Sequence, residues 1–177
     1  IVESLDLIDE HKDSFDNDSD VAKLACFYHD AIYDIFANDN EKRSAELFHK
    51  TVTNAGLSKE LTEQGYNLIL ATVHDGSTKT YDEELFTDVD LVSLAREPDE
   101  FKKYANKIEE EYTNGTGVSK QQFDQGRLTF LTTFLSRNHI FSTFLFRGKY
   151  EAKAIENMYD EKDELANNLD NKVIKLV

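Results

Sequence analysis

Apolar residues recur at three- and four-residue spacing along much of the chain, and this pattern constrains the fold more than any other feature of the sequence. It is clearest where Val21, Leu24, Ala25, Tyr28 and Ile32 fall on one stripe, after an acidic stretch that can cap a helix start. Only one Pro and seven Gly occur in 177 residues, so few positions oppose a helix. The sequence therefore predicts an all-α fold.

The periodic segments predict roughly eight helices and no strand. The expected helices lie at about 1–8, 19–36, 40–54, 58–76, 85–95, 98–112 and 119–135, with a last one from about 149. Ser119 and Gln122 have the spacing of a capping box, 75–82 is the long loop, and the apolar segment 140–146 is interpreted as a buried helical turn. Because this length is typical of one domain, we expect a single unit over 1–177.

Charge and cysteine content restrict the partners and the compartment. A formal charge of −15 repels both polymeric nucleic acid and anionic lipid, and no apolar run approaches the roughly 20 residues that span a bilayer. Cys26 is the only cysteine and cannot form an internal disulfide, which suits a reducing compartment. We therefore expect a cytoplasmic protein that binds neither nucleic acid polymers nor membranes. A homo-oligomer is compatible with these features.

His29 and Asp30 stand side by side within the apolar stripe of the helix expected at 19–36. His29 shares its stripe with Cys26 and Tyr33, and Asp30 lies about 100° further round the helix. Because buried charge is costly unless it is paired or bound to a metal, the pair is a candidate metal site. The alternative is a structural pair in which Asp30 orients His29.

Two later carboxylates and a second histidine are further candidates. If the helix is regular from Leu85, Asp88 projects among apolar residues and Asp90 points more nearly away, although a small shift of the helix boundary reverses this assignment. The alternative for both is a charge in the first helical turn, favoured by the helix dipole. His74 ends the preceding helix, where it approaches a metal or phosphate or acts only as a favourable cation at the C-terminus.

Six motifs occur in a fixed order along nearly the whole chain. They are Ala25-x-Phe27-Tyr28-His29-Asp30-x-x-Tyr33-Asp34, Asp39-Asn40-Glu41-x-x-Ser44-Ala45, Ala71-Thr72-x-His74, Asp88-x-Asp90-Leu91, Gly126-Arg127 through Phe134-Leu135-x-Arg137, and Glu151-x-x-Ala154-x-x-Asn157. Taken together, these motifs resemble the HD superfamily of metal-dependent phosphohydrolases, in particular its branch of predicted HD phosphohydrolases of unknown substrate.

The resemblance implies a helical bundle that holds one divalent cation. Its ligands would be a histidine from an early helix, the pair His29 and Asp30, and either Asp88 or Asp90. The early histidine is missing: the chain opens inside a helical pattern at Ile1, and we expect that the segment carrying the histidine lies upstream. Mn, Fe, Co, Ni, Zn and Mg all suit such ligands.

The implied reaction is hydrolysis of a nucleotide or another small phosphate ester by a metal-activated water. Asp34 and His74 are the candidate catalytic residues, although solvation is as good an explanation for Asp34. The candidate substrate-binding residues are Arg127, Arg43, Lys42 and Glu41, and each cation among them also suits a surface ion pair. The main rival function is a non-catalytic sensor of nucleotide or metal, and a purely structural interaction domain is a third alternative.

Overall fold

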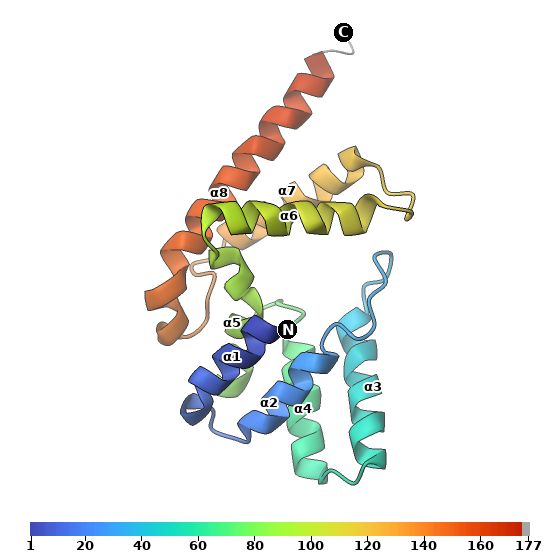
Figure 1. The fold of residues 1–177 in the computed structure, drawn as a ribbon, viewed down its shortest axis with the longest axis vertical. Coiled ribbons are helices and arrows are strands. Elements are labelled where there is room, and N and C mark those ends of the chain that lie inside the picture. The colour runs from blue at the N-terminus through green and yellow to red at the C-terminus, as the bar shows by residue number, and fades with distance from the viewer. Residues whose placement is uncertain (175–177) are drawn as a thin grey trace. The chain divides into compact units, whose positions relative to one another are not determined.

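The computed structural model describes the backbone of residues 1–174 and the side chains of residues 1–169, and every regular element in it is helical (Figure 1). The predicted all-α fold is confirmed. The helices are α1 Val2–Glu10, α2 Ser19–Tyr28, α3 Asn40–Asn54, α4 Lys59–Ala71, α5 Tyr81–Leu91, α6 Pro98–Thr113, α7 Lys120–Leu135 and α8 Phe144–Ile174, with short 3-10 turns η1 Lys12–Ser14 and η2 Val92–Ala95.

The chain divides into two compact units, Ile1–Asp90 and Leu91–Val177. In the first unit, α2, α3 and α4 pack against one another and α1 packs on α2. Its fully buried side chains include Ile8, Phe48, Leu68, Leu85 and Val89. The single domain expected from the chain length stays a prediction.

A glycine allows two helices of the first unit to approach closely. A Cβ atom at Gly65 of α4 would lie 2.3 Å from the Cζ atom of Phe48 on α3. Phe48 is fully buried and its ring fills the space that a side chain at position 65 would need. The contact fixes α3 against α4, and α3 follows directly after the segment that carries the candidate site.

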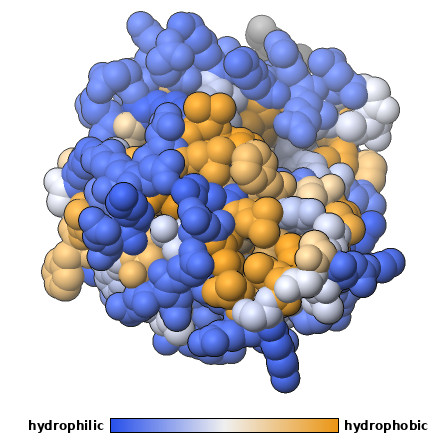
Figure 2. All heavy atoms as spheres, turned by 60° about the horizontal axis from the view of Figure 1, so that its bottom comes forward, coloured by the Kyte–Doolittle hydropathy of each residue, from blue (hydrophilic) through white to orange (hydrophobic). Residues whose placement is uncertain are grey.

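The second unit is built around α8. Helices α6 and α8 both pack near η2, and α7 packs against both α6 and α8. Asn157 on α8 donates hydrogen bonds to the carbonyl oxygens of Leu94 and Arg96, at 2.9 and 2.8 Å. Figure 2 turns the lower part of Figure 1, where α2, α3 and α4 of the first unit lie, toward the viewer, and it shows apolar residues gathered near the middle with hydrophilic residues around them.

Several predicted helix ends agree with the structure. Helix α3 has the predicted range, α6 begins at Pro98, and the capping box of α7 is present, with Ser119 and Gln122 each accepting a hydrogen bond from the other's backbone N–H. Helix α4 begins after its cap Ser58 but ends at Ala71 instead of near 76.

The helix predicted at 19–36 is wrong beyond Tyr28, where α2 ends. In the segment after α2, side chains of α3 form hydrogen bonds with the backbone, and these bonds replace the hydrogen bonds of a helix. The Ser44 hydroxyl accepts from Ile32 N–H at 3.0 Å, and the Asn40 amide accepts from Asp34 N–H and donates to Asp34 O, at 3.0 and 2.9 Å. His29 and Asp30 therefore lie at a helix end, not in the middle of a helix as predicted.

The start of the last helix also differs from the prediction, since α8 begins at Phe144 and not near 149. The segment predicted as a buried helical turn is irregular until that residue, and the Glu151 carboxylate accepts hydrogen bonds from the N–H groups of Ile140 and Phe141. Thr143 accepts a hydrogen bond from Phe146 N–H at 3.3 Å and so caps the start of α8. The apolar pattern of this segment did not indicate that start.

Candidate functional site

The C-terminus of α2 positions His29 with its ring turned back along the helix. The backbone N–H of His29 still makes a helical bond to Ala25 O at 2.9 Å. Ring atom Nδ1 lies 2.8 Å from Cys26 O, and because a carbonyl oxygen only accepts, Nδ1 carries the proton of this bond. His29 is buried, with 9% of its surface exposed. The second ring nitrogen, Nε2, is therefore the one available to another partner.

Two carboxylates face that nitrogen. His29 Nε2 lies 3.2 Å from Asp30 Oδ2 and 3.3 Å from Asp90 Oδ1. Asp30 is the next residue in the chain, whereas Asp90 comes from the end of α5. The expected approach of His29 to one of the two later carboxylates is met by Asp90.

The second oxygen of Asp90 contacts another imidazole. His74 Nε2 lies 2.8 Å from Asp90 Oδ2, in the segment between α4 and α5. Asp90 thus bridges two histidines that lie 45 residues apart in sequence. We call His29, Asp30, His74 and Asp90 the His–Asp cluster. All four belong to the first compact unit.

The close contacts within the His–Asp cluster shift two ionisation equilibria. Burial alone lowers the pKa of His29, but hydrogen bonds to Asp30 and Asp90 outweigh it and raise this pKa to about 11. For a carboxylate, burial acts in the opposite direction and raises the pKa. At Asp90, hydrogen bonds from His29 and His74 outweigh burial and hold the pKa below its ordinary value. The cluster therefore favours a positive charge on the His29 ring beside the ionised carboxylate of Asp90.

The donor atoms of the cluster suit a divalent cation chemically. Two donors bound to one cation at roughly 2.1 Å lie about 3.0 to 3.4 Å apart when adjacent, and the separations of His29 Nε2 from its two carboxylates fall in this range. A histidine whose Nδ1 donates to a carbonyl is also typical of metal ligands. Among the side chains of residues 1–169, however, no group of three or more His, Cys, Asp or Glu is already arranged to hold a metal ion. In the structure the cluster is closed by direct hydrogen bonds.

Asp88 lies two residues before Asp90 on the same helix. It is fully buried on α5, and two residues along a helix correspond to about 200° of rotation, so Asp88 and Asp90 leave the helix on opposite sides. The expectation that Asp88 projects among apolar residues agrees with its burial. Of the two alternatives that the sequence left open, Asp90 is the one that faces His29.

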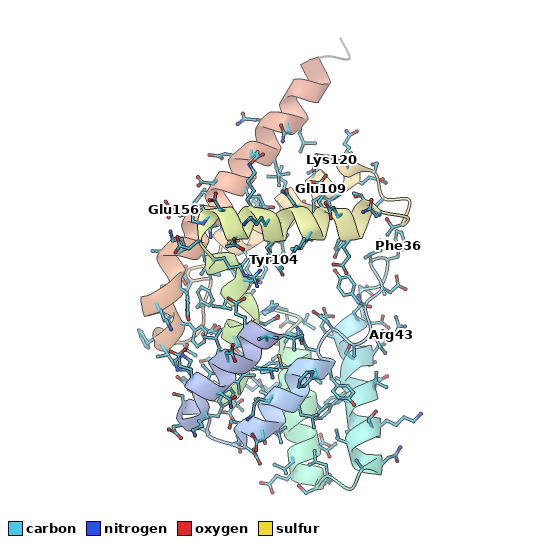
Figure 3. All side chains as sticks on the ribbon, in the orientation of Figure 1. Phe36, Arg43, Tyr104, Glu109, Lys120 and Glu156 are labelled. Carbon is cyan, nitrogen blue, oxygen red and sulfur yellow. The ribbon has the colours of Figure 1, made fainter. Side chains whose placement is uncertain are left out.

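Asp34 shapes the segment that follows the cluster. Its Oδ1 accepts a hydrogen bond from Phe36 N–H at 3.0 Å, and its backbone is bound on both sides by Asn40. Figure 3 shows Phe36 in this segment between α2 and α3. These bonds make Asp34 a turn residue, and its catalytic role stays a prediction.

The basic residues predicted near the site form weak surface contacts. Lys42 lies 4.0 Å from Glu46, and Arg43 lies 3.8 Å from Asp39, with all four side chains largely exposed. Figure 3 shows Arg43 near the start of α3. Glu41 occupies the first turn of the same helix, where a negative charge is favourable. Substrate binding by Glu41, Lys42 and Arg43 stays a prediction.

Arg127 belongs to the second unit, where its guanidinium group forms an ion pair. Its Nε and Nη2 atoms donate to the two carboxylate oxygens of Glu161, at 2.8 and 2.9 Å, and both side chains are mostly buried. Glu161 also lines a cavity of about 270 Å³ between α6, α7 and α8. A bidentate ion pair of this kind stabilises the unit, which agrees with the structural alternative for Arg127.

The beginning of the chain lies beside the His–Asp cluster. Ser4 of α1 lines a small cavity, about 10 Å³, together with Cys26, His29 and Asp90. Burial raises the pKa of the Cys26 thiol in this position. The first helix therefore lies next to the His–Asp cluster.

Sequence reasoning missed the groups that hold the cluster in place. The carbonyl of Cys26 orients His29, while Asn40 and Ser44 fix the backbone after Asp30. The three-residue spacing from Cys26 to His29 at a helix end is a signal that could have indicated the first of these bonds. Asn40 and Ser44 occur in a quoted motif, but nothing in the sequence assigns them a partner.

Comparisons with known proteins give no family assignment. No family model matches the chain, and neither curated proteins nor solved structures yield a match. The case for a function therefore depends on the His–Asp cluster.

Proposed function

We propose that this chain is a metal-dependent phosphohydrolase of the HD type that acts on a nucleotide or another small phosphate ester. The observation that carries the proposal is the position of His29 Nε2, which lies 3.2 Å from the Asp30 carboxylate and 3.3 Å from the Asp90 carboxylate. One neutral imidazole and two carboxylates are a common donor set for a catalytic divalent cation. The order of the sequence motifs supports the same function.

His29, Asp30 and Asp90 would hold the cation. A divalent ion in that position would act as a Lewis acid on a phosphoryl oxygen and would lower the pKa of a water molecule. The fixed Nδ1 bond to Cys26 O holds the ring of His29, so its Nε2 presents a lone pair once the second proton leaves. Mn, Fe, Co, Ni, Zn and Mg remain the candidate ions.

The proposed metal ligands differ in their exposure to solvent. The side chain of Asp30 is 65% exposed, whereas that of His29 is 10% exposed. A substrate can therefore approach the cluster from the side of Asp30, while His29 is shielded from water and anchored by the protein. Binding of a phosphate group there requires positive charge, because the surrounding surface is strongly acidic.

Turnover tests this proposal. The protein is incubated with each candidate divalent metal and with panels of nucleotides and small phosphate esters, and released phosphate or pyrophosphate is measured. We expect release that requires the metal and that a chelator abolishes. Release that persists unchanged in excess chelator, or no release from any substrate, would contradict the phosphohydrolase.

A non-catalytic sensor of metal or nucleotide is the second candidate. It is favoured by the direct hydrogen bond between His74 and Asp90, which occupies the Asp90 carboxylate in the metal-free protein. This function predicts binding of the metal or the nucleotide without turnover. The same assay, combined with a binding measurement, separates the two candidates.

We propose a cytoplasmic location, which the free and buried thiol of Cys26 supports. Within the part of the chain that the structure describes, no helix has the length and hydrophobicity needed to cross a bilayer.

A further inference from the structure

His74 has an unusual backbone conformation. Its φ angle is 55°, and no other non-glycine residue in the described part of the chain has a positive φ. It follows the end of α4, with its N–H bonded to Ala71 O at 3.2 Å. Helices often end on such a left-handed residue, but the position usually carries Gly or Asn because a Cβ atom there is unfavourable. A glycine has no Cβ atom and would avoid this cost, but the nearest glycine in the chain, Gly76, lies two residues later.

The left-handed backbone places the imidazole of His74 against Asp90. The side chain of His74 is only 15% exposed, and its Nε2 contacts Asp90 Oδ2 at 2.8 Å. A donor on Oδ2 restricts rotation of the carboxylate, so that Oδ1 stays directed at His29 Nε2. Backbone strain that persists at one residue is evidence that its side chain has a role.

We propose that His74 is a positioning residue that fixes the carboxylate of Asp90 toward His29. It acts through Asp90 and is not itself a metal ligand. The effect of this orientation on metal affinity rests on the proposed function, whereas the orientation itself is a property of the metal-free protein. The competing explanation is that His74 only ends α4, as a cation near the helix C-terminus.

Two substitutions separate these explanations. His74→Gly and His74→Asn both suit a left-handed backbone and both lose the imidazole. If His74 only ends the helix, the contact between Asp90 and His29 should be unchanged in both variants. His49→Gln is the matched control, because His49 also pairs with a carboxylate, Glu63, at 3.7 Å, but on an exposed surface.

The first readout needs no metal and no activity. The ¹⁵N and ¹H chemical shifts of the His29 ring are compared at one pH in the metal-free proteins. We expect the His29 chemical shifts to change in both His74 variants, because these variants release the Asp90 carboxylate. The shifts should stay the same in His49→Gln, which leaves Asp90 in place. Unchanged His29 shifts in a folded His74 variant would overturn the proposal, as would unfolding of both variants under conditions where the original protein is folded.

The second readout is affinity for Mn²⁺ or Zn²⁺, measured by calorimetry. Loss of a group that orients a ligand typically weakens metal binding about 10- to 100-fold, and we expect this loss in both His74 variants but not in His49→Gln. Equal affinities in all four proteins would overturn the proposal. If the original protein binds neither metal, the proposed function fails, and the His29 shifts alone decide the role of His74.

Discussion

Asp90→Asn is expected to abolish most hydrolytic activity while the helical content is retained. The substitution removes the one negative charge that both imidazoles contact, at 3.3 and 2.8 Å, and it removes a proposed metal ligand without changing side-chain volume. Loss of a residue that only orients a metal ligand typically costs about 10- to 100-fold, and because Asp90 is a proposed ligand we expect activity to fall by roughly 100-fold or more. Phosphate release and circular dichroism are measured on the same samples.

The matched control for this variant is Asp9→Asn. Asp9 forms an exposed ion pair with Lys23 at 2.9 Å, and pairs of this kind contribute little to stability. The control should therefore keep both its activity and its fold. Comparable activity in Asp90→Asn and Asp9→Asn would show that Asp90 does not hold a catalytic metal.

The metal-free protein is expected to lose stability as the pH rises from about 6.5 toward about 11. The pKa of His29 is raised to about 11 in the folded protein, whereas an unfolded histidine titrates near 6.5. Between these values the folded chain holds a proton that the unfolded chain has lost, so the free energy of unfolding decreases with pH. The stabilisation is fully present below about 6.5 and disappears through the folded-state pKa.

Comparison with His29→Gln isolates this contribution from other groups that titrate at high pH. Chemical denaturation is measured at several pH values for both proteins, with a chelator present. The original protein should show the steeper decline, and the two curves should converge near pH 11. Parallel curves from neutral to alkaline pH would mean that His29 does not carry a bound proton in the folded state.

The sequence predicted those parts of the fold that depend on local patterns. Helix α3, the start at Pro98 and the capping box of Ser119 and Gln122 follow from apolar spacing and from caps that act within a few residues. The end of α2 could not be predicted in this way. The apolar stripe continues through Ile32, but the backbone N–H groups of this segment donate hydrogen bonds to Ser44 and Asn40 on another helix, which hold the backbone in turns.

The residues of the candidate site and the approach of His29 to a later carboxylate were predicted from the sequence, but the identity of that carboxylate was not. His29, Asp30 and His74 were named from the sequence, and Asp88 and Asp90 remained as alternatives. Their assignment depends on the rotation of α5 about its axis, which a shift of one or two residues changes. The left-handed backbone of His74 was not foreseen either, because a histidine before an Asp-Gly pair carries no signal for a positive φ.

The central claim is that His29, Asp30 and Asp90 together bind one divalent cation, and calorimetric titration of the metal-free protein tests it most directly. Titrations with Mn²⁺ and Zn²⁺ are run at neutral pH in buffers of different ionisation enthalpy. We predict one bound ion per chain and release of a proton on binding, because the ion replaces the proton on His29 Nε2. Binding should be lost in His29→Ala and Asp90→Asn. Absence of binding in the original protein, or equal binding in these variants, would contradict the account.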